Sequence, residues 1–177
     1  MKKTFLMVGA ATMAVMAAAC SGGSSSGGTG LTSGSYTISN AAANPDTCLF
    51  GDLSSLNGTA HAVTVAGNNV SVDLGGSSPL ALTLAGTALS APQTTFDINW
   101  TDSSATGLAH SYNCMEHDTT DYTGTVTGKN KFNINVDNNW TAASGDPTAC
   151  RAGNNSAYML TLTQFPCESK IHVDLAK

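Results

Sequence analysis

Acidic and imidazole side chains stand close together in the middle of the chain, at Glu116, His117, Asp118 and Asp121. Carboxylate oxygens and one imidazole are groups that a divalent cation can accept as ligands. Their spacing matches no recognised metal motif, and the alternative is a solvated polar turn ahead of a strand near Tyr122. We therefore predict no bound metal and no cofactor, with these four residues as weak metal candidates.

Aromatic residues are the second set that could do chemistry. Trp100 and Trp140 could form a surface for a sugar or a small apolar ligand. Both also continue a strand alternation, so the alternative is that they fill a core. We treat both tryptophans as weak ligand-binding candidates together with Tyr122, Tyr158 and His61, and expect His61 otherwise to be a core or barrel-end residue.

No catalytic constellation stands out. The chain has no G-x-S-x-G motif, and neither His110 nor His172 has a carboxylate or Cys at catalytic spacing. Arg151 is the only Arg, which argues against a phosphate site built on bidentate Arg. We predict no catalytic residue and no enzyme, although a paired-carboxylate hydrolase stays open because carboxylates can meet in space.

The composition narrows the classes of protein to which the chain can belong. Only 11% of the 177 residues are charged, with 7 Lys and Arg against 12 Asp and Glu. Thr, Ser, Gly and Asn number 23, 19, 18 and 14. An acidic chain without a basic run is not a nucleic-acid binder. The residues that a helical bundle needs are also too few.

The N-terminus carries a targeting signal. Lys2 and Lys3 precede an apolar run at residues 5–19, which is too short to span a bilayer comfortably. The run ends in Ala17-Ala18-Ala19-Cys20 and resembles the signal of bacterial lipoproteins, although Ala17 stands where Leu is usual.

The lipoprotein resemblance implies removal of residues 1–19 and acylation of Cys20, with palmitate among the acyl chains. Ser21 in place of Asp implies the outer membrane, with the periplasmic or outer face left open. The alternative is an ordinary secretory signal that leaves Cys20 as a free thiol. Residues 20–33, rich in Gly and Ser, predict a flexible linker, and residues 34–177 predict one domain.

Apolar and polar residues alternate with a period of two along most of the domain, as in strands with one wet face. We find no amphipathic helix, and at most one helical turn at residues 52–57. The predicted strands are 34–40, 59–66, 69–75, 79–85, 87–100, 110–127, 131–142, 157–165 and 170–175.

Short repeated patterns predict hairpins. Gly67, Gly86 and Gly128 each follow a short apolar and Thr-rich strand, and tight turns favour Gly and Asn. A D-x-N-W-T sequence occurs at 97–101 and again at 137–141, and each copy is followed by a Cys and a Tyr. This echo favours a duplication, with convergent strand patterning as the alternative.

Removing Cys20 leaves Cys48, Cys114, Cys150 and Cys167. An even number in an exported domain predicts two disulfides. We favour Cys48–Cys114 with Cys150–Cys167, while the repeat supports Cys114–Cys150 as the alternative.

These observations predict an all-β fold, a single antiparallel up-and-down meander of eight or nine strands that closes into a barrel or nearly does so. A two-sheet sandwich is the alternative. The architecture is similar to small calycin-type barrels, which bind hydrophobic ligands, although Gly34-Ser-Tyr36 stands where lipocalins have G-x-W.

We expect a lipid-anchored envelope or surface protein with a non-enzymatic binding or structural β domain. The anchor makes the membrane one partner, and a small molecule or an envelope component is a possible second partner. The alternatives are a calycin-like barrel for a small hydrophobic ligand and a hydrolase with an unrecognised site.

Overall fold

Eight antiparallel strands follow one another around a closed barrel in sequence order. The computed structural model describes residues 30–76, 78–101, 111–158 and 160–177, and in this part of the chain it confirms the all-β meander. The strands are β1 (Gly34–Asp46), β2 (Ala60–Ala66), β3 (Asn69–Val72), β4 (Leu80–Ala85), β5 (Ala88–Asn99), β6 (Cys114–Gly128), β7 (Lys131–Gly145) and β8 (Cys167–Ala176).

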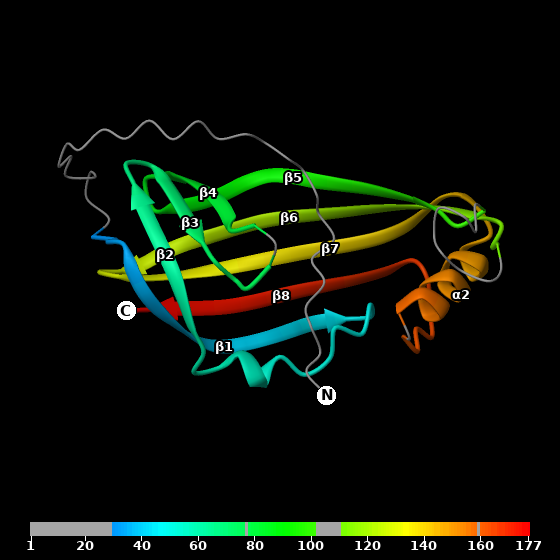
Figure 1. Ribbon diagram of the computed structural model, residues 1–177, viewed down its shortest axis with the longest axis horizontal. Helices are drawn as coiled ribbons and strands as arrows, with labels where there is room; N and C mark the ends of the chain where they lie inside the picture. The colour runs from blue at the N-terminus through cyan, green and yellow to red at the C-terminus, as the bar shows by residue number, and fades with distance from the viewer. Residues whose placement is uncertain (1–29, 77, 102–110, 159) are drawn as a thin grey trace.

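The barrel has a closed half and an open half. Figure 1 shows the short strands β2, β3 and β4 together at one end, while β5 to β8 and β1 continue well beyond them. We call the part that β2 to β4 complete the closed half. The inner face of the longer strands beyond them forms the open half.

Hairpin turns join the strands at the closed half as predicted. Gly67 and Gly86 have positive φ angles of 60° and 62°, and Asn130 has 53° in the turn between β6 and β7. Gly and Asn adopt this conformation at little cost, which explains their recurrence after each strand. A single 3-10 turn, η1 (Ser54–Leu56), lies within the predicted 52–57.

Side chains fill the closed half. The residues of its core are exposed by 0–7% and come from every strand. Tyr36 caps this core, with its ring edge on Phe132 and its hydroxyl donating to the Thr32 carbonyl oxygen at 2.8 Å. Leu31, which we placed in the linker, is 3% exposed in the same core, so the folded domain includes it.

One predicted strand is wrong. The described residues of 157–165 form no strand, and α2 (Pro147–Tyr158) takes their beginning and the preceding segment, contrary to our expectation of no helix longer than one turn. Asp146 caps the helix by accepting from the Thr148 N–H at 2.8 Å, and Pro147 suits a first helical turn. The Asp-Pro pair was the signal in the sequence, but the helix consists mostly of small and polar residues, which concealed its buried face.

Two disulfides are present, as predicted, but our preferred pairing is wrong. Cys114 on β6 bonds Cys150 on α2, which is the pairing that the repeat suggested. Cys48, after β1, bonds Cys167 at the start of β8. The preferred pairing failed because the strand order places β8 beside β1, and that neighbourhood depends on closure of the sheet.

The two D-x-N-W-T copies lie at the end of β5 and within β7, and the segments that follow them differ. Trp100 follows β5 and is 1% exposed, while Trp140 lies within β7 and is half-buried. The Tyr that follows lies in a strand in the first copy, as Tyr122, and at the end of a helix in the second, as Tyr158. The sequence echo therefore covers two strands, and among the described residues it does not extend to the Tyr segments.

Candidate functional site

Strand β6 separates the acidic and imidazole residues of the 116–121 segment. Successive side chains of a strand point to opposite faces, so Glu116 and Asp118 share the inner face and His117 and Asp121 the outer face. On the outer face the His117 Nδ1 atom lies 2.6 Å from Asp97 Oδ1, and Asp121 accepts from Gln93. The described residues contain no group of three or more His, Cys, Asp or Glu placed to hold a metal ion.

Glu116 is completely buried in the open half, beneath α2. Its Oε2 atom accepts from Trp100 Nε1 at 2.5 Å and from Asn154 Nδ2 at 2.6 Å. Both donors are neutral, so the Glu116 carboxylate is stabilised by two short hydrogen bonds and not by a positive charge. Burial nevertheless raises the pKa of Glu116, because desolvation outweighs these hydrogen bonds.

Asp118 lies beside Glu116 on the same strand face. The pKa of Asp118 is raised to about 9. Burial is the main cause, and repulsion from the neighbouring Glu116 carboxylate is the second. Two carboxyl groups this close do not both ionise readily, so the pair holds one proton near neutral pH. Because Trp100 and Asn154 donate to Glu116, we assign the negative charge to Glu116 and the proton to Asp118.

Three buried oxygen atoms around the pair accept no hydrogen bond from any other residue within the described part of the chain. They are Glu116 Oε1, Asp118 Oδ1 and Asn154 Oδ1. None of the ion pairs among the described residues includes Glu116 or Asp118. The protonated Asp118 is hydrogen-bonded to Glu116, and the pair is therefore a buried negative charge without a cationic partner among the described residues.

Aromatic side chains flank this pair across the sheet. Asp118 is paired with Phe96 on β5 and with Trp140 on β7, and cross-strand partners share one face. Phe96 is 42% exposed, and Trp140 is half-buried with its ring edge on Phe50. The open half therefore presents a carboxyl group between two aromatic rings.

Helix α2 covers one side of the carboxyl pair. Trp100 packs edge-on against Tyr158, whose ring is 42% exposed at the end of α2. Burial first, and after it the negative charges of Glu116 and Asp118, raise the pKa of the Tyr158 hydroxyl. Trp100 itself is sealed and can only position Glu116.

A polar row lies next to the carboxyl pair toward the closed half. Thr120, Asn138 and Ser169 are cross-strand partners on the inner face, and Thr120 Oγ1 donates to Asn138 Oδ1 at 2.9 Å. Ser169 Oγ is fully buried and has no partner among the described residues. Tyr122 follows on the same face and is half-buried beside the packed core.

The structure thus brings together five of the predicted residues and leaves others apart. The five that meet in the open half are Glu116, Asp118, Trp100, Trp140 and Tyr158. His61 lies apart, and its two ring nitrogens hydrogen-bond with Thr59 Oγ1 and the Asp73 carbonyl oxygen. Cys20 and His110 lie outside the described residues.

Sequence reasoning missed two residues of the site. Phe96 was visible in the strand alternation but had no partner to suggest a role. Asn154 carried no signal, since the helix that positions it was not predicted.

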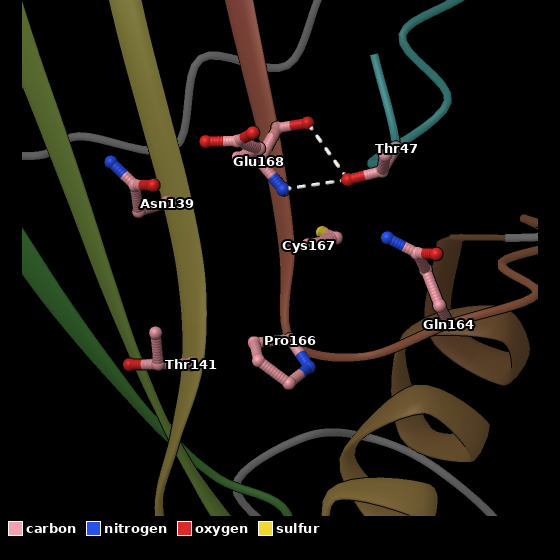
Figure 2. A pocket seen from close by; sticks show the side chains of 7 residues that line it. All are labelled: Thr47, Asn139, Thr141, Gln164, Pro166, Cys167 and Glu168. Atoms are coloured by element: carbon pink, nitrogen blue, oxygen red, sulfur yellow. Dashed lines mark hydrogen bonds between the residues drawn. The ribbon is translucent and has the colours of Figure 1, made fainter. Parts of the chain in front are cut away.

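A hollow lies on the outer face of β7 and β8. It has a volume of about 370 Å³, and Figure 2 shows Thr47 Oγ1 hydrogen-bonded to the backbone of Glu168 at its edge. Its lining is otherwise Asn139, Thr141, Gln164, Pro166 and Cys167. With one carboxylate and no aromatic ring, this hollow offers less chemistry than the open half.

Comparisons of the chain with models of protein families, with curated proteins and with solved structures gave no match. The chemistry of the site therefore has to be argued from its geometry. A protonated Asp118 could donate a proton to a bound molecule, but the sealed Glu116 could not reach that molecule as a second catalytic carboxylate.

Proposed function

We propose that the protein is a lipid-anchored envelope protein whose β barrel binds a small organic cation in its open half. The proposal has two parts, an anchor at Cys20 and a binding site around Asp118. The observation that carries the binding site is the carboxyl pair without a cationic partner, flanked by Phe96 and Trp140.

The anchor is supported by the targeting signal and the Gly/Ser segment that follows Cys20. Within the described residues, no helix is long and apolar enough to cross a membrane. Two or more acyl chains give stable attachment where a single chain is marginal. The mass of the protein purified from membranes tests this part, because acylation adds the mass of the chains to a polypeptide that begins at Cys20.

The binding part is supported by the contrast between the two halves of the barrel. The core side chains of the closed half are exposed by only 0–7% and pack against one another. The open half has partly exposed aromatic rings and a carboxyl group between them. Aromatic faces and a carboxylate together attract an organic ammonium group.

A metal ion fits this site less well than an organic cation does. Only two carboxyl groups face it, and the Trp100 and Asn154 donors occupy one oxygen of Glu116. The partly exposed rings of Phe96 and Tyr158 contribute nothing to metal coordination but suit a methylated amine.

Titration calorimetry with benzyltrimethylammonium tests the binding part, with benzyl alcohol and benzenesulfonate as uncharged and anionic controls. We expect binding of the cation only, and binding at least about tenfold weaker in Asp118→Asn. Asp121→Asn, on the outer face of the same strand, is the matched variant and should bind normally.

The pH dependence provides a second readout. Because Asp118 must release its proton to face a cation as a carboxylate, affinity should rise by up to about tenfold per pH unit below its pKa. Equal binding of all three probes, or of both variants, would contradict the cation site and favour a purely structural domain.

A further inference from the structure

Lysine side chains gather at the end of the barrel where the chain enters. Lys129 and Lys131 flank the turn between β6 and β7, and Lys177 is the last residue of the chain. All three are exposed. Gly30 lies at the same turn, since its carbonyl oxygen accepts from the Asn130 N–H at 3.2 Å.

Lys177 ties the entering chain to this end. Its Nζ atom donates to the Ser33 carbonyl oxygen at 2.8 Å and to Thr32 Oγ1 at 3.1 Å. Figure 1 shows the first described residues, the β6–β7 turn and the C-terminus together at the end away from α2. We call this end, with its three lysines, the linker end.

Acidic side chains lie elsewhere. Asp174 is the one described Asp or Glu near the linker end, and its Oδ2 atom accepts from Asn40 Nδ2 at 2.7 Å. The remaining described acidic residues stand at mid-barrel or beyond: Asp46, Asp52, Asp73, Asp97, Glu116, Asp118, Asp121, Asp137, Asp146 and Glu168. With them are only two basic residues, Arg151 and Lys170, so the domain has a basic end and an acidic remainder.

The chain length keeps the linker end close to the anchor. Nine residues separate Cys20 from Gly30, and all but Thr29 are Gly or Ser. A flexible chain of that composition and length reaches about 17 Å on average. An acidic domain on so short a tether would be repelled by an anionic membrane in every orientation except the one that presents its lysines.

We propose that the linker end rests on anionic phospholipid head groups of the leaflet that holds the Cys20 anchor, so that the open half and α2 point away from the membrane. This inference rests on the proposed anchor. It assigns Lys129, Lys131 and Lys177 to a lipid-facing surface and gives a soluble ligand free access to the site around Asp118.

Amine acetylation of the intact lipidated protein tests the orientation. The protein is reconstituted in vesicles of phosphatidylethanolamine with phosphatidylglycerol, or of phosphatidylcholine alone, and acetylation at each Lys is followed by mass spectrometry. We expect about fivefold slower labelling of Lys129, Lys131 and Lys177 in the anionic vesicles. Lys170, on β8 far from the linker end, is the internal control and should not change.

Salt and substitution separate electrostatic docking from simple crowding by the anchor. About 1 M KCl should restore the labelling rates, since the protection depends on charge. The Lys129→Gln/Lys131→Gln variant should free Lys177 from protection, whereas Lys170→Gln should leave the protection unchanged.

Two outcomes would overturn the proposal, and they can be told apart. Protein that carries no acyl group and does not float with vesicles would remove the anchor and the orientation together. Lipidated protein that floats, but whose four lysines react equally in both kinds of vesicle, would overturn the orientation alone.

Discussion

Glu116 and Asp118 together keep a proton near neutral pH, where the same two carboxyl groups in water would both be ionised. Glu116 receives two neutral donors and no cation, and Asp118 then faces a buried negative charge. Desolvation and repulsion both favour the protonated form of Asp118. The pair is consequently a source of pH dependence in stability as well as in binding.

Stability should fall as pH rises, because folded Asp118 keeps a proton that the unfolded chain loses. Its pKa is about 9 in the folded protein against an ordinary 3.8. Between these values the folded state binds more protons, so the unfolding free energy decreases with pH, by up to about 1.4 kcal/mol per unit. Urea unfolding between about pH 5 and pH 8 measures this slope.

Asp118→Asn should flatten that slope, and Asp121→Asn should preserve it. A variant Asp118→Asn with the same slope as the parent protein would show that the buried pair does not hold the extra proton.

Helix α2 is the element that seals Glu116. It carries Asn154 to the carboxylate, and Cys150 holds it to β6. Gly153 of this helix is buried against Trp100. A Cβ atom there would lie 2.7 Å from Trp100 Cδ2, which is too close for any side chain.

Gly153→Ala should therefore lower the free energy of unfolding, whereas the same substitution in an exposed helix raises it. In an exposed helix, Ala in place of Gly stabilises by about 1 kcal/mol. Here the methyl group would displace Trp100 from Glu116, and we expect a loss of about 1–3 kcal/mol. Chemical denaturation measures the change, and Ser156→Ala, on an exposed position of the same helix, is the control. A stabilised Gly153→Ala variant would refute the close packing.

The whole molecule depends on the contact between its first and last strands. β1 and β8 pair along the barrel, and Cys48–Cys167 links them across 119 residues of sequence. Cys114–Cys150 links elements only 36 residues apart. The two disulfides therefore constrain the unfolded chain to different degrees.

Removing the long-range disulfide should cost more stability than removing the local one. Chain entropy alone gives losses of about 5 kcal/mol for Cys48→Ser/Cys167→Ser and about 4 kcal/mol for Cys114→Ser/Cys150→Ser. Thermal and urea unfolding of the two double variants compare them directly. If the order were reversed, packing of α2 on Trp100 and Glu116 would outweigh closure of the barrel as the main source of stability.

Local properties could be read from the sequence alone. Alternating side chains, Gly and Asn at the turns, and an even number of cysteines predicted the meander, the hairpins and two disulfides. These features depend on neighbouring residues, whose conformational preferences act over a few positions. The same local alternation also determined that Glu116 and His117 would part to opposite faces once the segment became a strand.

Only the tertiary structure decided which distant groups meet. Residues far apart in the chain meet in three places. Cys48 pairs with Cys167, Glu116 is buried under Asn154, and one end of the barrel gathers Lys129, Lys131 and Lys177. Closure of the barrel sets these neighbours, since strand order and register place residues side by side whatever their sequence distance. The proton held by Asp118 has the same origin, because burial, which local sequence does not specify, determines its pKa.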